Sequence, residues 1–412
     1  LSLSLSLYIS LCEIKQRMSS DPPAVFLTCI GLATIFALAL SYSSPTPFKF
    51  NTHHDIEGDK SCDVFKGTWV RDHLNHSSSS SSSRPRYTSS NCATIPEKQN
   101  CFKHGRKDKE FLEWRWEPDD ERCRLSRFEP EKFMEVVGGK TVGFVGDSVA
   151  RNHMDSLICH LSQVEVPVQE YKDAKNRNQI YKFPNHGLTL RLIWTKYLVV
   201  GEERIINGSM SGIVDLRLDK VDDNWAKELH TLDYVIISTA QWFFRPMYLH
   251  DGPNVVSCIY CKEPGVPERG VEFAVRMAFR AALEYINRCD NCRGMVTLAR
   301  TYSPSHFENG GWNTGGTCNR TTPVRGEEIN LEGVDWELRN IQVEEIERVA
   351  RERTPGKKFG VVDITRAMLL RPDGHPGVYW RDKRKRGFND CVHWCLPGPI
   401  DLWNDFLLFV LT

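Results

Sequence analysis

Apolar residues along this chain fall into short runs of strand type and longer runs with helical spacing. The short runs predict strands at Thr141–Gly146, Leu190–Trp194, Tyr234–Thr239, Met295–Ala299 and Phe359–Ile364. The longer runs predict helices at Val149–Leu161, Val271–Arg288, Trp336–Arg353 and Ile400–Leu411. Because the two kinds of run alternate, the sequence predicts an α/β fold with a mostly parallel sheet and helices on both faces.

One further apolar run, from Ala24 to Leu40, is at the short end of what crosses a membrane. No small-residue cleavage site follows it, so we interpret it as a retained signal-anchor. The first methionine is Met18, and we interpret the residues before it as translated upstream sequence. The expected order is a short cytosolic segment (1–23, with 1–17 upstream sequence), the anchor (24–41), a stem (42–60) and a lumenal domain (61–412).

Charge and cysteine content narrow the class of protein. The formal net charge is zero, which argues against a nucleic-acid binder and suits a neutral polymer as partner. Fourteen cysteines favour an oxidising compartment. The pairs Cys258-x-x-Cys261 and Cys289-x-x-Cys292 have zinc-ribbon spacing, but behind a signal-anchor disulfides are the favoured interpretation, and no metal is expected. Glycosylation sequons occur at Asn75, Asn207 and Asn319.

The first predicted strand of the core ends at Gly146-Asp147-Ser148, and a predicted helix follows at once. A turn of this kind exposes one side chain at the sheet edge and aims the first N–H groups of the helix beside it. Ser148 therefore fits a nucleophile with a cradle for an oxyanion. The alternative is that Asp147 is only an N-cap and Ser148 an ordinary first-turn residue.

A carboxylate and an imidazole stand three residues apart near the other end, at Asp390 and His393. One tight turn can bring the carboxylate to the inner ring nitrogen, which leaves the outer nitrogen for the serine. Cys391 and Cys395 flank His393 and would hold this loop in place. The sequence therefore predicts a catalytic triad of Ser148, His393 and Asp390.

Other histidines compete for the role of base. Asp373 and His375 form a rival carboxylate–histidine pair, although a separation of one residue makes their hydrogen bond harder to close. His306 lies in a Ser- and Asn-rich loop, and His153 follows Ser148 on the helix and is expected to face elsewhere. We interpret His306 and His375 as structural or substrate-contacting residues.

Gly-Asp-Ser together with Asp-x-x-His resembles the GDSL/SGNH class of serine esterases and acyltransferases. Longer strings resemble the plant trichome-birefringence-like polysaccharide O-acetyltransferases, most closely the members that acetylate xyloglucan and mannan. These strings are Cys62–Trp69, Trp114–Trp116, Gly146–His153, His306–Gly310, Arg371–Pro376 and Asp390–Gly398. The resemblance runs from about Cys62 to the C-terminus and implies an SGNH-hydrolase-like core (136–412) behind an N-terminal Cys-rich segment (61–135).

The resemblance also implies a set of disulfides that staple the fold. These are Cys62–Cys123, Cys92–Cys159, Cys101–Cys395 and Cys318–Cys391. The last two would tie the loop of Asp390 and His393 to distant parts of the chain. Cys258, Cys261, Cys289 and Cys292 are then left to pair among themselves.

Several residues around the triad are expected to orient the acetyl carbonyl or to contact sugar. The N–H of Ser148 is one oxyanion donor, and the second should come from the loop after Tyr234–Thr239. The family usually has Gly-His where this chain has Ala240-Gln241, and the amide of Gln241 can still donate. The full expected set is Asp147, Arg151, Asn152, Gln241, Trp242, His306, Asn309, Trp312, His375 and Trp394. For any one of the tryptophans the alternative is burial in the core, and for Arg151 and Asn152 it is a surface salt bridge or cap.

The resemblance implies an O-acetyltransferase that moves acetyl through an acetyl-serine onto a cell-wall hemicellulose, xyloglucan first and mannan next. The resemblance implies an acetyl donor, for which acetyl coenzyme A is a candidate source, or a membrane protein that supplies the donor, and it implies no resident cofactor. Its expected location is the Golgi membrane, as a single-pass type II protein. A polysaccharide acetylesterase with the same triad and a non-catalytic wall-polymer-binding protein remain as alternatives.

Overall fold

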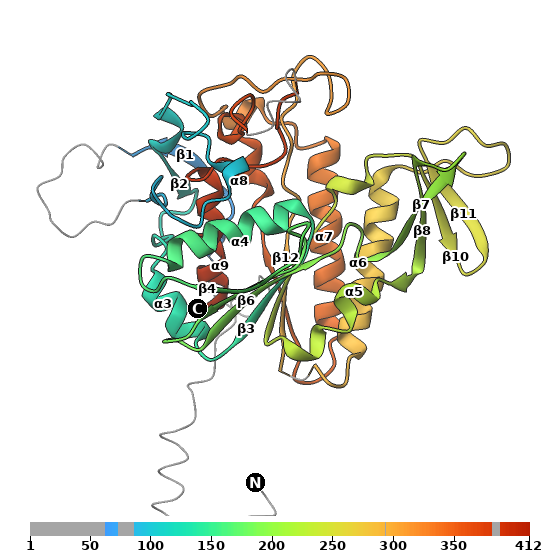
Figure 1. Ribbon diagram of the computed structural model, residues 1–412, viewed down its shortest axis with the longest axis horizontal. Coiled ribbons are helices and arrows are strands. Elements are labelled where there is room, and N and C mark those ends of the chain that lie inside the picture. The colour runs from blue at the N-terminus through green and yellow to red at the C-terminus, as the bar shows by residue number, and fades with distance from the viewer. Residues whose placement is uncertain (1–61, 73–85, 293, 381–387) are drawn as a thin grey trace, which may run out of the picture. The chain divides into compact units, whose positions relative to one another are not determined.

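The computed structural model describes residues 62–72, 86–292, 294–380 and 388–412 (Figure 1). The predicted cytosolic segment, anchor and stem, and the sequon at Asn75, lie outside the described residues. Within those described ranges, none of the helices is both long and apolar enough to span a membrane.

A seven-stranded sheet forms the centre of the fold, in the order β13-β12-β9-β3-β6-β5-β4. The neighbours from β13 to β6 are parallel, whereas β5 and β4 join the edge antiparallel. The sheet is therefore mixed rather than mostly parallel throughout. The sequence pattern did not predict this antiparallel edge, because every residue of β4 is exposed and the strand has no apolar run. The bounds are β3 (Thr141–Gly146), β4 (Val168–Lys172), β5 (Gln179–Phe183), β6 (Leu188–Trp194), β9 (Tyr234–Ser238), β12 (Val296–Arg300) and β13 (Lys358–Val362).

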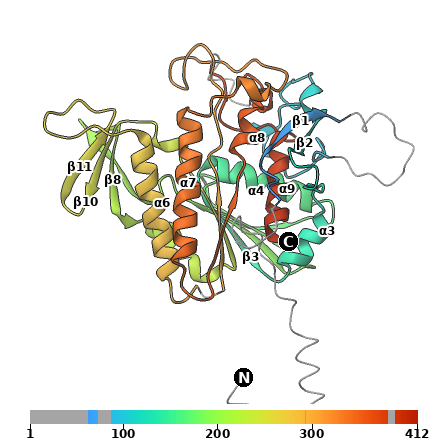
Figure 2. The same cartoon turned by 180° about the vertical axis from the view of Figure 1, so that it is seen from behind.

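Helices cover both faces of this sheet, as the alternation of runs predicts (Figures 1 and 2). Phe144 of β3 packs edge-on against His153, while its neighbour Val145 belongs to a buried cluster with Ala278 and Ile341. Successive side chains of a strand point to opposite faces, so α4 and α9 lie on one side and α6 and α7 on the other. The bounds are α3 (Pro130–Val137), α4 (Ser148–Leu161), α5 (Asp223–Ala226), α6 (Val271–Arg288), α7 (Val334–Arg351), α8 (Thr365–Leu369) and α9 (Leu402–Leu411).

The predicted core elements agree with these bounds to within two residues. Thr141–Gly146 and Val271–Arg288 begin and end where the apolar pattern places them. The last run is split, because Pro399–Asp401 forms a short 3-10 turn before α9 begins at Leu402. Pro399 suits the first position of this turn, because the N–H that proline lacks would have no partner within the helix there.

A second sheet of four strands, in the order β11-β10-β8-β7, lies beyond α6 in both views (Figures 1 and 2). Its strands are β7 (Val199–Ile206), β8 (Ser209–Val221), β10 (Met247–Asp251) and β11 (Asn254–Ile259). The β7–β8 hairpin turns at Asn207-Gly208, both at positive φ, as an Asn-Gly turn of this length requires. Asn207 and Asn319 are both exposed, and their glycosylation stays a prediction.

The N-terminal segment folds onto the core as a two-stranded ribbon of β1 (Gly67–Arg71) and β2 (Trp114–Pro118). Two tryptophans anchor it. The indole N–H of Trp69 donates to the carbonyl oxygen of Ala367 in α8 at 2.8 Å, and that of Trp116 donates to Val64 at 2.8 Å. The two rings meet edge-on at 5.7 Å. The ribbon therefore packs against the part of the chain that leads to Asp390 and His393.

Six disulfides cross-link the described residues. They include the four pairs that the resemblance implies, Cys62–Cys123, Cys92–Cys159, Cys101–Cys395 and Cys318–Cys391. The remaining cysteines close within each short motif, as Cys258–Cys261 and Cys289–Cys292. Both Cys-x-x-Cys motifs are therefore disulfides in this structure, the form that the sequence favours for an oxidising compartment.

Candidate active site

Ser148 is the first residue of α4 and stands where β3 ends. The turn depends on Gly146, because a Cβ there would lie 1.9 Å from the carbonyl oxygen of Ser238 on the neighbouring strand. Asp147 caps the helix, and its carboxylate accepts the N–H of Val149 at 2.9 Å. The N–H of Ser148 belongs to the first turn, where no intrahelical acceptor exists, so it is a donor suited to a developing oxyanion.

Asp147 is itself completely buried, and burial raises its pKa. The positive charge of Arg300 acts against this effect and lowers the pKa of Asp147. Arg300 is a buried cation that the sequence pattern did not single out. Arg300 ends β12 and donates to the hydroxyl of Ser238 at 2.6 Å and to the carbonyl oxygen of Thr301 at 2.8 Å. Burial lowers its pKa to about 10, which leaves it charged at neutral pH. The sequence does contain a signal for Arg300, because this arginine is the last residue of an otherwise uncharged, buried strand.

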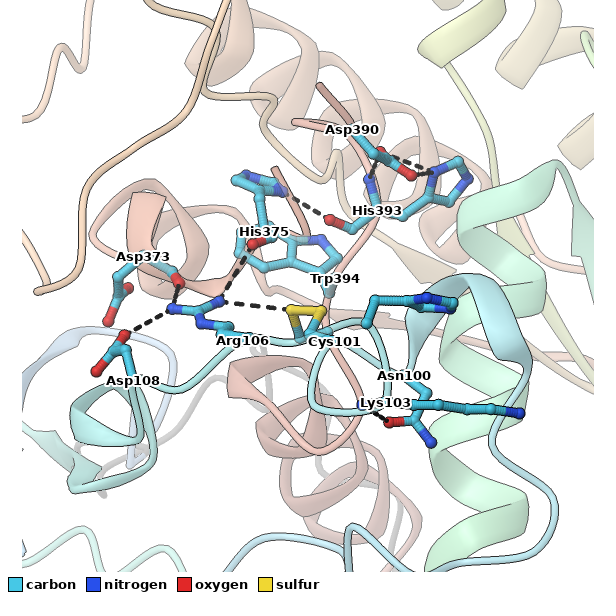
Figure 3. The surroundings of a disulfide bond; sticks show 12 residues. Asn100, Cys101, Lys103, Arg106, Asp108, Asp373, His375, Asp390, His393 and Trp394 are labelled. Carbon is cyan, nitrogen blue, oxygen red and sulfur yellow. Dashed lines mark hydrogen bonds and ion pairs between the residues drawn. A yellow bond between two sulfur atoms is a disulfide. The ribbon is translucent and has the colours of Figure 1, made fainter. Parts of the chain in front are cut away.

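Asp390 and His393 pair as the triad requires (Figure 3). The Nδ1 of His393 lies 2.9 Å from one carboxylate oxygen of Asp390 and 3.1 Å from the other. The same carboxylate accepts the backbone N–H groups of His393 at 3.0 Å and Val392 at 3.2 Å. Burial would raise the pKa of Asp390, but the imidazole and these N–H groups outweigh it and hold that pKa well below its usual range. Asp390 is therefore an anion that keeps the proton on Nδ1.

The outer nitrogen of His393, Nε2, is buried and has no hydrogen-bond partner among the described residues. Asn152 places that ring relative to the nucleophile. The amide oxygen of Asn152 accepts the N–H of Trp394 at 2.8 Å, and its Nδ2 donates to the carbonyl oxygen of Trp394 at 3.3 Å. Asn152 lies one helical turn past Ser148, so this pair of bonds fixes the loop of His393 against the start of α4. Asn152 is a positioning residue, not a surface cap.

Two disulfides hold the loop from its other sides. Cys391 is bonded to Cys318. Cys395 is bonded to Cys101 in the disulfide that Figure 3 shows, so the cysteines on either side of His393 are both tied to distant chain. The carbonyl oxygen of Cys391 also accepts the N–H of His306 at 3.1 Å. The orientation of the imidazole is therefore built into the fold before any substrate binds.

Ser148 at the start of α4 and the paired Asp390 and His393 are the groups that an acyl-transferring serine enzyme needs, and comparison with known families finds such a family. The family described as the GDSL/SGNH-like acyl-esterase family found in Pmr5 and Cas1p matches residues 125–410. The chain belongs to this family. The Pmr5 N-terminal domain matches residues 60–123, which contain the β1–β2 ribbon. The resemblance inferred from the two motifs is thereby confirmed.

Individual relatives cover nearly the whole chain. The chain is 56% identical to Xyloglucan O-acetyltransferase 4 of Populus trichocarpa, over 97% of this chain and 95% of the relative. It is 47% identical to xyloglucan O-acetyltransferase 2 of Arabidopsis thaliana, over 94% of this chain and 92% of the relative. It is 42% identical to Protein trichome birefringence-like 20 of Arabidopsis thaliana, over 85% of this chain and 72% of the relative.

Within this member of the acyl-esterase family, His306 and His375 support the catalytic loop from behind. The Nδ1 of His375 donates to the carbonyl oxygen of His393 at 2.7 Å, and its Nε2 lies 2.7 Å from Nδ1 of His306. Burial lowers the pKa of His306 to about 4 and that of His375 well below the usual value, so both rings are neutral at neutral pH. The Nε2 of His306 also lies 3.2 Å from the carbonyl oxygen of Leu369, so three contacts compete for the two N–H groups of a neutral pair.

The rival pair of Asp373 and His375 does not form. Both carboxylate oxygens of Asp373 accept from the guanidinium of Arg371, at 2.8 and 3.0 Å, and both side chains are fully buried. His153 also faces away from the site, between Phe144 and Trp403. His393 is therefore the histidine that the structure equips as a base.

Trp394 was expected to contact sugar, and that expectation is wrong. Its side chain is completely buried, and its ring stacks on His375 with centroids 4.0 Å apart (Figure 3). The indole N–H donates to the hydroxyl of Ser303 at 2.8 Å. A ring enclosed in this way offers no face to a polymer, and Trp394 instead packs behind the catalytic loop.

The loop expected to carry the second oxyanion donor has an unusual backbone. Ala240 adopts φ +151° and ψ −17°, a conformation that glycine tolerates and that other residues adopt at a cost. This strain agrees with the glycine that the resemblance implies at this position. Gln241 follows in η5 (Gln241–Phe243), and its amide donates to the carbonyl oxygen of Ser303 at 3.0 Å. One N–H of Gln241 is thus committed to the protein, and its role as a donor to substrate stays a prediction.

We expect Ala240→Gly to raise the free energy of unfolding by about 1 kcal/mol. Relief of backbone strain is worth roughly 1–3 kcal/mol, and the loss of one buried methyl group costs roughly 0.8 kcal/mol. Urea denaturation of the two proteins measures the difference. A variant less stable than the parent by 1 kcal/mol or more would show that the loop is not strained.

Trp312, unlike Trp394, is open to solvent. Its side chain is 59% exposed and lines a cavity of about 570 Å³ together with Tyr260, which is 56% exposed. The complete lining is Ser211, Gly212, Phe244, Arg245, Pro246, Tyr260, Trp312 and Asn313. Asn309 is exposed on the same loop as Trp312 but does not line the cavity. The cavity adjoins the end of η5, so it opens next to the loop of Ala240 and Gln241.

Proposed function

We propose that this protein is a xyloglucan O-acetyltransferase that works through an acetyl-serine intermediate. The observation that carries the proposal is the state of His393. Its Nδ1 is held by an anionic Asp390, while its Nε2 has no partner in the part of the chain that the structure describes. The loop of His393 is hydrogen-bonded to the helix that Ser148 begins. Relatives that cover more than nine-tenths of the chain are named xyloglucan O-acetyltransferases, which points to the acceptor.

In the first half-reaction, the hydroxyl oxygen of Ser148 attacks the carbonyl carbon of the acetyl donor, and Nε2 of His393 takes the hydroxyl proton. The N–H of Ser148 stabilises the resulting oxyanion at the start of α4. When the tetrahedral intermediate collapses, the bond to the leaving group breaks and the leaving group receives the proton from His393. Acetyl-Ser148 remains, and His393 is neutral again.

In the second half-reaction, a sugar hydroxyl replaces the leaving group. His393 takes its proton, the sugar oxygen attacks the acetyl carbonyl, and collapse returns the proton to the oxygen of Ser148. The open aromatic faces of Trp312 and Tyr260 suit an apolar face of a neutral sugar, which supports the cavity beside η5 as the binding site of the acceptor. The product is an acetyl ester on the polymer.

The proposal extends to the cellular setting. A protein of this kind meets nascent hemicellulose in the Golgi lumen, as a single-pass type II membrane protein anchored through residues 24–41. Six disulfides among the described residues suit an oxidising lumen. The acetyl donor is a co-substrate, or is delivered by a membrane protein, rather than a resident cofactor.

The test uses the full chain purified in detergent with acetyl coenzyme A and oligosaccharides of xyloglucan, mannan and xylan. Mass spectrometry should show xyloglucan oligosaccharide gaining one acetyl group, and Ser148→Ala should reduce the rate at least a thousandfold. Acetate release without a gain of mass on any sugar would indicate an acetylesterase. Full activity of Ser148→Ala would overturn the mechanism, and sugar binding without turnover would indicate a binding protein.

A further inference from the structure

A cluster of four cations lies beside Ser148 and has no part in the chemistry derived above. It consists of Arg151, Arg177, Lys196 and Arg245, here called the cationic cluster. We propose that the cationic cluster binds the phosphate groups of the acetyl donor while its acetyl group reaches Ser148. The inference rests on the proposed acyl transfer and specifies the chemical class of the donor as a phosphate-bearing acyl compound.

Two tryptophans hold the cationic cluster together. The indoles of Trp194 and Trp242 meet edge-on with centroids 6.5 Å apart. The guanidinium carbons of Arg151 and Arg177 lie 5.8 and 5.6 Å from the ring of Trp194. Lys196 and Arg245 lie 4.4 and 4.6 Å from the ring of Trp242. Cation–π contacts at such distances keep flexible side chains in place, so the cluster is ordered before a ligand arrives.

The cluster lies on the edge of the sheet where Ser148 stands. Trp194 is the last residue of β6 and pairs with Gly146, two positions before Ser148. Trp242 belongs to η5, which follows β9, and the last residue of β9, Ser238, also pairs with Gly146. Arg151 lies on the first turn of α4. In parallel sheets this carboxyl edge is where ligands bind.

The positive charge of the cluster is only partly offset, through longer-range interactions of Arg151 with Asp155 and of Lys196 with Glu203. Within the described part of the chain, none of its four side chains forms an ion pair with a carboxylate. Burial lowers the pKa of Lys196, and the charges of Arg245 and Arg177 lower it further, against a weaker contribution from Glu203. The Nε of Arg245 is buried without a hydrogen-bond partner. Like charges gathered in this way destabilise the free protein, and an anion would relieve the repulsion.

The anion must come with the donor, because a xyloglucan acceptor carries no charge. Arginine guanidinium groups match phosphate oxygens in a bidentate geometry, and a lysine adds a point charge. All four side chains are partly exposed, so a ligand can reach them. Arg245 also lines the aromatic cavity, so the phosphates and the sugar would approach Ser148 from adjoining positions.

The test compares two acetyl donors on the full chain, acetyl coenzyme A and the uncharged para-nitrophenyl acetate. Lys196→Met and Arg177→Met should each raise KM for acetyl coenzyme A about tenfold, and the double variant about a hundredfold. KM for para-nitrophenyl acetate should change less than twofold. Lys140→Met is the matched control, because Lys140 precedes β3 at the opposite edge of the sheet and pairs only with Asp233.

Binding of coenzyme A, followed by quenching of tryptophan fluorescence, separates this inference from the proposed function. Binding that weakens in the two variants, even with no acetyl transfer to any sugar, would support the site and refute the transferase. An absence of coenzyme A binding by the parent protein would overturn the inference, as would equal increases in KM for both donors. Tighter binding of an acidic oligosaccharide than of coenzyme A would also overturn it, because the cluster would then serve a charged glycan.

Discussion

Asp390→Asn should keep its fold and lose about ten-thousand-fold in kcat, the scale known for this change in other serine triads. The amide oxygen can still accept the N–H groups of Val392 and His393, so the loop keeps its shape. The amide NH₂ then faces Nδ1 of His393 and forces the proton onto Nε2. A nitrogen that already carries a proton cannot take one from Ser148, and the general-base step is lost.

Initial rates of acetyl transfer, together with circular dichroism and thermal unfolding, check this expectation. Asp219→Asn serves as the control, because Asp219 is an exposed carboxylate of β8 far along the chain from the triad. A loss below tenfold in Asp390→Asn would show that another group sets the tautomer of His393. An unfolded variant would be uninformative about tautomers, so His393→Gln provides a second change at the other end of the same hydrogen bond.

The second large effect concerns the disulfide between Cys101 and Cys395, which joins residues 294 positions apart. Replacing both cysteines by alanine should lower the free energy of unfolding by about 3–5 kcal/mol, because a cross-link over a long loop restricts the unfolded chain most. The five other disulfides in the described residues shorten the effective loop, so the lower half of that range is the better expectation. Activity should also fall, since Cys395 is two residues from His393.

The matched control is the double replacement of Cys289 and Cys292, whose bond spans only three positions. It should cost about 1–2 kcal/mol by the same loop argument. It should leave kcat within twofold, because Cys292 precedes β12 at the end of the strands opposite Ser148. Urea denaturation and initial rates measure both pairs of variants. Equal losses of stability in the two double variants would contradict an effect of loop length.

The core of this fold could be predicted because its strands and helices carry apolar runs of the appropriate period. The pairing of Asp390 with His393 could be predicted because the two residues form one local motif. The contact of His393 with Ser148 stays a prediction. Strand β4 could not be predicted, since all its residues are exposed and its pairing depends on β5. The role of Asn152 also escaped, because a surface cap and a buried bridge to Trp394 look the same in sequence.

Arg300 and the cationic cluster could not be predicted from the sequence for a different reason, which is that their positions depend on tertiary packing. An arginine after an apolar strand can point to solvent or into the core, and only the packing of β9 beside β12 determines which. The members of the cluster come from four separate segments, so no spacing rule connects Lys196 with Arg177 or Arg245. Trp394 was misjudged for a related reason, because its proximity to His393 in sequence says nothing about whether its ring faces substrate or core.

The bridge between Asn152 and Trp394 spans 242 positions of the chain, so the two halves of the catalytic machinery leave the ribosome at different times. At translation rates of about 5–20 residues per second, the nucleophile waits roughly 10–50 s for its base. During that interval the nascent polypeptide contains Ser148 but lacks His393. Cys101 and Cys395 are 294 positions apart, so the disulfide that holds the loop of His393 can form only after almost the whole chain has been made.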